Sequence, residues 1–329
     1  MPSAFDWNCE LSWIKEYRFP LDQGMQTVYE CLKNWMDDYN RNIMITTFMT
    51  SEEKEQIKIF SDRLMQAYEL YVDNRYIEAF NIFNQAMDSA KNHLPTAPVG
   101  RASAYVADSI PYYRIMAGNN KYNRLQFLHI PCNSRQLASA NRFSVPGMPC
   151  SYMASAKRVA WYECKMPDSF QWAKFEAVKH DKKLIQLDLN PLTSTLSLIS
   201  ELPKERWTED ERKSFARGYC FILPLIASCS VIAKEKEKSF VEAYIIPQML
   251  MIWVKTVQIT SVCGIIQVLI MSWYETIVDI ILPCPQNILT KTDIVLTFKK
   301  FLELTIQTKP MKWNSWISRR NFTTTIRYK

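Results

Sequence analysis

The sequence has few of the side chains from which metal sites are usually built. Its three histidines, His93, His129 and His180, lie far apart, and none of its nine cysteines belongs to a C-x-x-C pair. An odd number of cysteines, several of them inside apolar runs, favours buried thiols in a reducing compartment over a disulfide framework. We therefore predict no metal site and a cytoplasmic location.

The sequence also lacks an apolar leader, because its first residues, MPSAFDWNCE, carry an acid early and contain no continuous apolar stretch. Residues 256–274 carry no charge and have about the length of a membrane-spanning helix. Their glutamines, β-branched residues and Gly264 instead predict a turn followed by a buried strand. A transmembrane helix remains the alternative.

No extreme of composition is present. Hydrophobic residues make up 48% and charged residues 22% of the 329 residues, as in folded globular proteins. The formal net charge of +7 suits a phosphate-bearing ligand, an acidic partner or nucleic acid, without choosing among them.

The first 97 residues have the pattern of amphipathic helices. Apolar side chains recur at intervals of three and four residues from Ile57 to Tyr71 and again from Ala79 to Met87, with a cap region near Ser51. The pair resembles a single tetratricopeptide-type unit, but one copy cannot form a solenoid. The run LPTAPVG, residues 94–100, marks the boundary of this helical N-terminal region.

After residue 98 the pattern changes to α+β. The runs YYRIM, QFLHIP, CSYMA, KLIQLDL and CFILPLIASCSVIA predict strands, and Thr208 with Glu211 predicts a capping box that begins a helix. We assign residues 98–313 to one α+β domain and residues 314–329 to a basic tail. The run EKEKS at 235–239 predicts a loop tip, and the tail is either a frayed end or a contact for single-stranded nucleic acid.

One glutamate stands out in the helix predicted from AKRVAWYECK. Ser155 is placed to cap this helix and Pro167 to end it. At 100° per residue Glu163 shares a face with Val159 and Ala160, which predicts that its carboxylate points inward. A buried carboxylate needs a cation or donors, so either a structural ion pair with a core arginine or a catalytic role follows.

Two arginines are candidates for the cationic partner. Arg114 in YYRIM and Arg142 in NRFS lie in or beside predicted strands rather than on charged helices. A guanidinium fork can hold a diphosphate. Tyr152, on the strand before the Glu163 helix, either packs in the core or stacks on a planar heterocycle.

At these residues the chain resembles the RES domain, the toxin half of RES–Xre toxin–antitoxin pairs. The resemblance runs over residues 105–255 through YYRI, HIPC, NRFSVPGMPCSYMAS, AWYE, PLIASCSV and YIIPQMLMIWV. It implies a mixed-sheet fold similar to ADP-ribosyltransferases and consumption of NAD as substrate, by phosphorolysis, hydrolysis or ADP-ribosyl transfer. It also implies an Xre-type antitoxin partner and a possible oligomer, with nucleic acid and membranes as unlikely partners.

The resemblance assigns roles to particular residues. Arg114 and Arg142 would bind the NAD phosphates, Tyr152 would stack on the nicotinamide, and Glu163 would hold the nicotinamide ribose. Tyr113 is assigned to NAD binding as well. Cleavage of the nicotinamide N-glycosidic bond develops positive charge on that ribose, which a fixed carboxylate stabilises. Nicotinamide is a good leaving group, so this chemistry requires neither a metal nor a general acid.

The late serine of the family is assigned to Ser230, with Ser228 as its near neighbour. The sequence departs from the family at Met116, where relatives carry a second arginine, and at Cys263, where an acidic residue is expected. These departures leave open a catalytically degenerate domain that binds partners through its N-terminal helices. A basic nucleic-acid binder is the third hypothesis, and it rests on the net charge and the tail.

Overall fold

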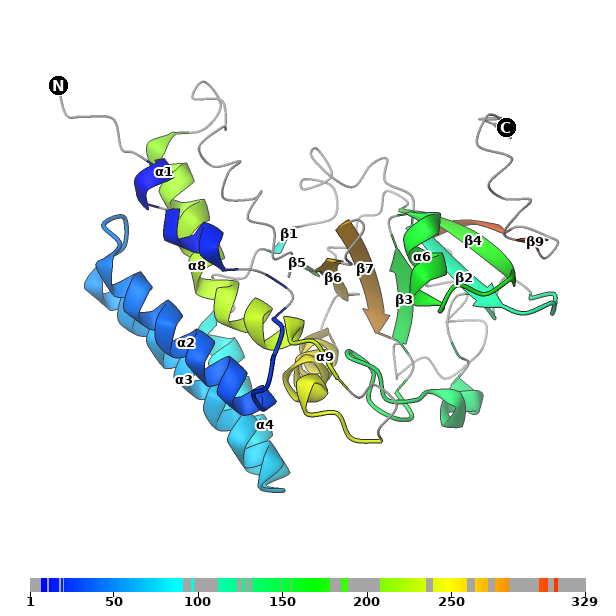
Figure 1. The fold of residues 1–329 in the computed structure, drawn as a ribbon, viewed down its shortest axis with the longest axis horizontal. Coiled ribbons are helices and arrows are strands. Elements are labelled where there is room, and N and C mark those ends of the chain that lie inside the picture. The colour runs from blue at the N-terminus through cyan, green and yellow to red at the C-terminus, as the bar shows by residue number, and fades with distance from the viewer. Residues whose placement is uncertain are drawn as a thin grey trace.

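A computed structural model of the protein shows most of its helices gathered on one side of a β-sheet (Figure 1). It describes residues 7–10, 12–17, 19, 21–90, 96–97, 112–122, 126–127, 130, 132–148, 150–154, 156–177, 185–188, 208–234, 239–258, 264–271, 276–283, 302–306 and 311–312. The fold is α+β, as the sequence predicts.

The N-terminal region is helical. It contains α1 (Trp7–Glu10), a 3-10 turn (Ser12–Glu16), α2 (Val28–Ile45), α3 (Ser51–Val72) and α4 (Tyr76–Ala90). Both α2 and α3 begin at a capping box, in which a threonine and a glutamate three residues later satisfy each other's backbone N–H groups. The cap of α3 is Thr50, one residue before the predicted Ser51.

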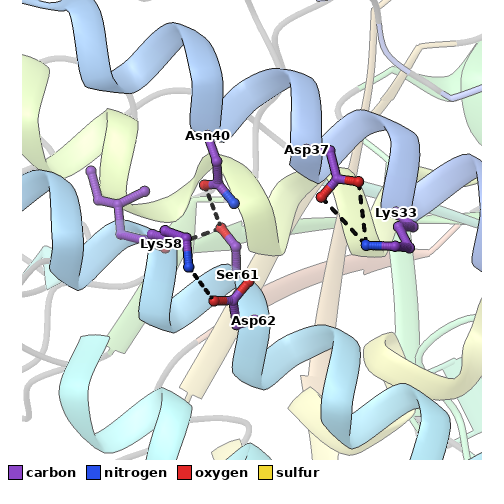
Figure 2. A network of polar contacts seen from close by, with 7 residues as sticks. Lys33, Asp37, Asn40, Lys58, Ser61 and Asp62 are labelled. Carbon is purple, nitrogen blue, oxygen red and sulfur yellow. Dashed lines mark hydrogen bonds and ion pairs between the residues drawn. The ribbon is translucent and has the colours of Figure 1, made fainter.

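The predicted apolar face of α3 is confirmed. Ile57, Phe60 and Leu64 are almost fully buried, and Ser61 between them donates hydrogen bonds to Ile57 O at 3.0 Å and to Asn40 Oδ1 on α2 at 3.3 Å (Figure 2). Lysine–aspartate pairs four residues apart lie on the exposed faces of both helices. Such exposed pairs contribute about 0.3–0.5 kcal/mol each, so burial of the apolar face holds the helices together.

Two further helices complete this layer, α8 (Glu209–Ser230) and α9 (Ile245–Gln258), joined through a 3-10 turn, η4 (Glu242–Tyr244). The capping box of Thr208 with Glu211 is confirmed at the start of α8. The strand predicted from residues 220–233 is wrong, because α8 continues through Ser230. The apolar run is buried on every side of the helix, so it shows no helical period.

Pro224 lies inside α8, where its missing N–H leaves the carbonyl of Cys220 without its usual helical partner. The hydroxyl of Tyr39, from α2, donates to Cys220 O at 2.5 Å and replaces the lost bond. Tyr39 is fully buried, so no solvent can serve that carbonyl instead. A side chain far away in the sequence thus makes the proline tolerable within a helix.

The strands form one mixed sheet in the order β1-β5-β6-β7-β3-β2-β4-β8, with β9 also paired to β4. Every pair is antiparallel except β5 with β6. The bounds are β1 (Thr96–Ala97), β2 (Tyr112–Ala117), β3 (Cys150–Ala154), β4 (Ser169–Ala177), β5 (Ile185–Asp188), β6 (Gly264–Met271), β7 (Thr276–Pro283), β8 (Leu302–Ile306) and β9 (Met311–Lys312).

The strands predicted at YYRIM, CSYMA and KLIQLDL are confirmed as β2, β3 and β5, and the strand predicted after Gly264 is β6. Within the predicted strand QFLHIP, Gln126 and Phe127 are helical, so that prediction is wrong where the structure describes it. A short 3-10 helix (Cys132–Leu137) and α6 (Lys157–Glu163) flank β3 in the chain, and α6 packs on β2 and β3 (Figure 1).

The N-terminal helices share one continuous core with α8 and α9. Leu21 N donates to Ser230 O at 3.1 Å, and Ile232 N donates to Leu21 O at 2.8 Å. Phe60 of α3 lies against Phe221 of α8, with ring centroids 5.4 Å apart. The helical region therefore supports the end of α8 directly.

Several predictions fall on residues outside the described part, namely the tail 314–329, Cys263, residues 235–238 of EKEKS and the three histidines. The domain boundaries at residues 97 and 313 stay predictions. Within the described residues, no helix is both long and apolar enough to cross a membrane.

Candidate active site

Arg142 lies at the tip of a tight turn formed by Asn141–Ser144, which we call the Arg142 turn. The backbone groups of Asn141 and Ser144 exchange hydrogen bonds of 3.0 and 3.1 Å, which closes the turn. A second turn follows at Pro146-Gly147, where Met148 N donates to Val145 O at 2.9 Å. Gly147 has a φ of +76°, which the third position of such a Pro-Gly turn requires. The Pro-Gly pair in the sequence by itself indicates such a turn, and the structure confirms it.

Side chains from α9 and β3 hold the Arg142 turn in place. Gln248 of α9 donates from Nε2 to Asn141 O at 3.0 Å and to Ser144 O at 3.2 Å. The Tyr152 hydroxyl, from β3, accepts from Phe143 N at 3.2 Å and lies 2.8 Å from Ser144 Oγ. The turn is thus fixed from α9 on one side and from the sheet on the other.

The Arg142 guanidinium rests on the C-terminal end of α8. Its Nη1 donates to Cys229 O at 2.9 Å, and its Cζ lies 5.4 Å from the centre of the Tyr244 ring. Carbonyls at a helix C-terminus lack intrahelical partners and carry partial negative charge, which attracts a cation. Among the described residues, no carboxylate forms an ion pair with Arg142, and Cys229 O is its one hydrogen-bond acceptor.

This environment disfavours the charge of Arg142. Burial lowers the pKa of its guanidinium, while Tyr244, Cys229, Tyr152 and Glu163 each act to raise it. A guanidinium has five N–H donors, and the helix carbonyl takes one. The remaining donors and the weakly compensated charge suit an anionic ligand.

Glu163 is the last residue of α6, and the structure explains why the helix stops there. Met166 N donates to Trp161 O at 3.0 Å and Lys165 N donates to Tyr162 O at 2.9 Å, the bonding pattern of a Schellman cap. Lys165 and Met166 have φ of +61° and +53°, a region that non-glycine residues rarely adopt. The helix therefore ends four residues before Pro167, which was predicted to end it.

Other expectations for α6 need correction. Its N-cap is Ala156, without a side-chain hydrogen bond, rather than Ser155. Val159 and Ala160 are buried as predicted. Trp161, which 100° per residue places away from the Glu163 face, is also buried and donates to Pro167 O at 2.9 Å. Glu163 is exposed, so the prediction that its carboxylate points into the core is wrong. Because α6 ends at Glu163, the packing that buries Val159 and Ala160 does not extend to the Glu163 side chain.

The exposed Glu163 carboxylate nevertheless interacts electrostatically with the Arg142 guanidinium. Its negative charge is close enough to raise the pKa of Arg142 and that of Tyr244, whose pKa burial raises further. A carboxylate at the C-terminal end of a helix opposes the helix dipole, at a cost of about 0.3–1 kcal/mol. The side chain thus stands where helix stability disfavours it and where the field of Arg142 favours it.

Arg114 approaches the same helix end. Its Nη1 donates to Phe127 O at 2.8 Å, burial lowers its pKa to about 10, and Cys164 acts to raise that pKa. Cys164 directly follows Glu163 and donates from Sγ to Ile115 O at 3.3 Å. Each arginine thus feels a group at the end of α6 electrostatically, Arg142 the Glu163 carboxylate and Arg114 the Cys164 thiol.

Tyr113 lies beside Lys157 of α6 and Trp172 of β4. The Nζ of Lys157 lies 3.6 Å from the centre of the Trp172 ring and 5.5 Å from that of Tyr113. Strand alternation points Arg114 away from Tyr113, so the two side chains do not line one face of β2. Tyr113 packs with α6, and its predicted contact with NAD stays a prediction.

The two candidate serines differ in exposure. Ser228 is buried within α8 and donates to Pro224 O at 2.8 Å, whereas Ser230 is partly exposed at the helix end and donates to Ala227 O at 3.1 Å. Ser230 directly follows Cys229, whose carbonyl receives Arg142. Of the two, Ser230 has the position from which a ligand on Arg142 could be reached.

The sequence analysis missed Tyr244 and Gln248, which hold Arg142 and its turn. They lie four residues apart across the junction of η4 and α9, within the run YIIPQMLMIWV, but that run gave them no role, because their partners are about 100 residues away. Among the described residues, no group of three or more potential ligand side chains could hold a metal ion.

The features described so far define a class of site rather than an activity. A closed turn presents a guanidinium, an exposed carboxylate lies within its field, and a partly exposed serine ends the neighbouring helix. Such a set can bind an anionic group and stabilise a positive charge developing beside it.

Comparisons with known proteins give one relative to set beside this geometry. The chain is 28% identical over 254 residues to a protein of Bacillus subtilis (strain 168) named "Putative toxin YopC", in a match covering 74% of this chain and 55% of the relative. The chain thus spans about half the length of that relative. No family model matches the chain. No solved structure matches it either.

Proposed function

We propose that the protein is a toxin that consumes NAD by breaking the bond between nicotinamide and ribose. The toxin role is supported by the similarity to the Bacillus subtilis protein named a toxin. The NAD chemistry is supported by the resemblance of the sequence to RES domains, with their ADP-ribosyltransferase-like fold. One structural observation carries the assignment of the site: a largely buried guanidinium with no carboxylate partner among the described residues lies within the field of an exposed carboxylate.

In this proposal Arg142 binds the NAD diphosphate through the N–H groups that Cys229 O leaves open. Fork-shaped donation to phosphate is the strongest use of a guanidinium, and the dianionic ligand compensates the charge that burial disfavours. Arg114 adds a second positive charge near the end of α6. Tyr152 holds the Arg142 turn through its hydroxyl, and the resemblance to RES domains makes its ring the candidate surface for nicotinamide.

Glu163 stabilises the ribose while the glycosidic bond breaks. The bonding electrons pass to the pyridinium nitrogen, which leaves as neutral nicotinamide, and the ribose becomes an oxocarbenium ion. The fixed carboxylate offsets that positive charge, and an acceptor oxygen then bonds to the same ribose carbon and loses its proton to solvent. The acceptor is phosphate, water or a protein side chain.

The test uses purified protein with NAD, with and without inorganic phosphate, and chromatographic detection of nicotinamide. We expect Glu163→Gln to lower nicotinamide release by about 100-fold or more, because loss of one electrostatic stabiliser costs about 2.7–4 kcal/mol of barrier. Arg142→Lys should raise KM for NAD, because an ammonium lacks the planar fork. Unchanged release by Glu163→Gln would remove that residue from the mechanism. Tight NAD binding without any release would instead favour the degenerate domain.

An antitoxin partner follows from the same proposal. A cell that makes such a toxin must restrain it, and RES domains are paired with Xre-type proteins. Co-expression with the protein encoded beside it should restore growth to cells that this chain arrests. Growth arrest that depends on Glu163 but is not relieved by any neighbouring protein would contradict the paired arrangement.

A further inference from the structure

The start of α9 contacts the Arg142 turn at two separate points. Gln248 bonds the backbone on both sides of the turn, and Tyr244 presents its ring to the Arg142 guanidinium, Cζ to ring centre 5.4 Å. Tyr244 is 8% exposed, so the ring is fixed by its packing rather than by solvent. A cation within about 6 Å of an aromatic ring centre is attracted to its face, most strongly where water is excluded.

The Tyr244 ring can restrict the orientation of the Arg142 guanidinium, which its single hydrogen bond does not do. Only Nη1 of Arg142 has a fixed partner among the described residues, and a single bond leaves a guanidinium free to rotate about it. A ring beside the guanidinium restricts that rotation while occupying none of its N–H donors. The N–H groups of Arg142 then keep one orientation toward a bound anion.

We propose that Tyr244 is a positioning residue that orients the Arg142 guanidinium for a diphosphate and thereby sets the affinity for the dinucleotide. This inference rests on the proposed NAD-binding function and adds a residue to it. The aromatic ring, and not the hydroxyl, does this work. The carboxylate chemistry of Glu163 is then unaffected once the ligand is bound.

The position of Tyr244 also links the site to the N-terminal helices. Glu242, two residues earlier in η4, accepts a hydrogen bond of 2.9 Å from the Tyr68 hydroxyl of α3. Phe240 stacks on Tyr71 of the same helix, with planes 3° apart and centroids at 6.5 Å. Helix α3 therefore holds the segment from which Tyr244 reaches Arg142.

The experiment titrates ADP-ribose, the diphosphate part of the ligand, into the full-length protein by calorimetry. We expect Tyr244→Phe to bind within about twofold of the unaltered protein, because the ring remains. Tyr244→Leu should bind about 5- to 30-fold more weakly, as expected for loss of a largely desolvated cation–ring contact. Its KM for NAD should rise by a similar factor while kcat stays within about twofold.

A double-mutant cycle separates positioning from a general effect on the fold. In an Arg142→Ala protein, Tyr244→Leu should cause no further loss of ADP-ribose affinity. Tyr76→Leu, the same change at a tyrosine without contact to Arg142, should leave affinity unchanged in both backgrounds. If Tyr244→Leu does not fold, Tyr244→Met replaces it, because an unbranched side chain adapts to an irregular space.

The outcomes distinguish this inference from the proposed function. Failure of the unaltered protein to bind ADP-ribose, or equal binding by Arg142→Ala, would overturn the proposed function itself. Weaker binding by Arg142→Ala together with equal binding by Tyr244→Leu and Tyr244→Phe would overturn only the role of Tyr244. A loss in Tyr244→Phe as large as in Tyr244→Leu would assign the effect to the hydroxyl and also refute the proposal.

Discussion

Removing the Tyr39 hydroxyl should destabilise the protein because Pro224 depends on it. In Tyr39→Phe the carbonyl of Cys220 stays buried, with neither the helical N–H that Pro224 lacks nor the hydroxyl that now donates at 2.5 Å. A buried acceptor left without a donor costs about 1–3 kcal/mol. With an unfolding slope of about 3 kcal/mol per molar urea, the midpoint should fall by roughly 0.3–1 M.

A second pair of variants restores the missing backbone N–H of α8 by replacing Pro224. In a Pro224→Ala protein, residue 224 has an N–H that can serve Cys220 O, so Tyr39→Phe should cost much less there. We expect a coupling free energy of about 1–2 kcal/mol in this cycle, whatever Pro224→Ala does to stability alone. The assay is equilibrium urea unfolding followed by tryptophan fluorescence. Equal costs of Tyr39→Phe in the two backgrounds would refute the reasoning.

Three further predictions follow from the fold. Lys165→Gly should raise the free energy of unfolding by about 1 kcal/mol in urea titrations, since the left-handed backbone there costs a side chain about that much; a destabilised variant would show that the lysine side chain is needed. Glu163→Gln should be at least as stable as the unaltered protein, because at this exposed position the repulsion between the charge and the helix dipole outweighs its solvent-screened attraction to Arg142, and a lower thermal midpoint would contradict this. Burial raises the pKa of Tyr39 and Tyr68, so their contribution to stability is complete below about pH 10, the pKa of an unfolded tyrosine, and is lost as pH rises toward their folded-state pKa values. The urea midpoint should therefore fall steadily as pH rises above about 10, and a constant midpoint would count against it.

The elements that the sequence predicted correctly are those whose signals are local. The apolar spacing from Ile57 to Tyr68 and the capping box of Thr208 with Glu211 each place a helix through neighbouring residues alone. The turn at Gly147 needs only the proline before it and a positive φ. These features could be predicted because no distant residue decides them.

The sequence-based predictions were wrong where contacts between residues far apart in the chain determine the local structure. The run after Cys220 is apolar on every side and contains Pro224, so its pattern fits a buried strand as well as a buried helix. Only the Tyr39 hydroxyl, which lies 181 residues earlier in the chain, shows how the proline is accommodated. The sequence alone could not supply that contact.

The candidate site shows the same division. Arg142 and Glu163 could be chosen from the sequence, because an isolated arginine in a turn and a glutamate on an apolar helix are locally unusual. The exposure of Glu163 depends on where α6 ends, which the Schellman cap at Lys165 decides. The parts of the site contributed by Tyr244 and Gln248 required the tertiary structure.

The central claim is that the Arg142 turn and the end of α6 together hold a dinucleotide, and a crystal structure with ADP-ribose tests it most directly. The account predicts a diphosphate oxygen at about 2.7–2.9 Å from the Arg142 guanidinium and the terminal ribose within hydrogen-bonding distance of Glu163. A ligand bound elsewhere on the protein, or a diphosphate held without Arg142, would contradict it.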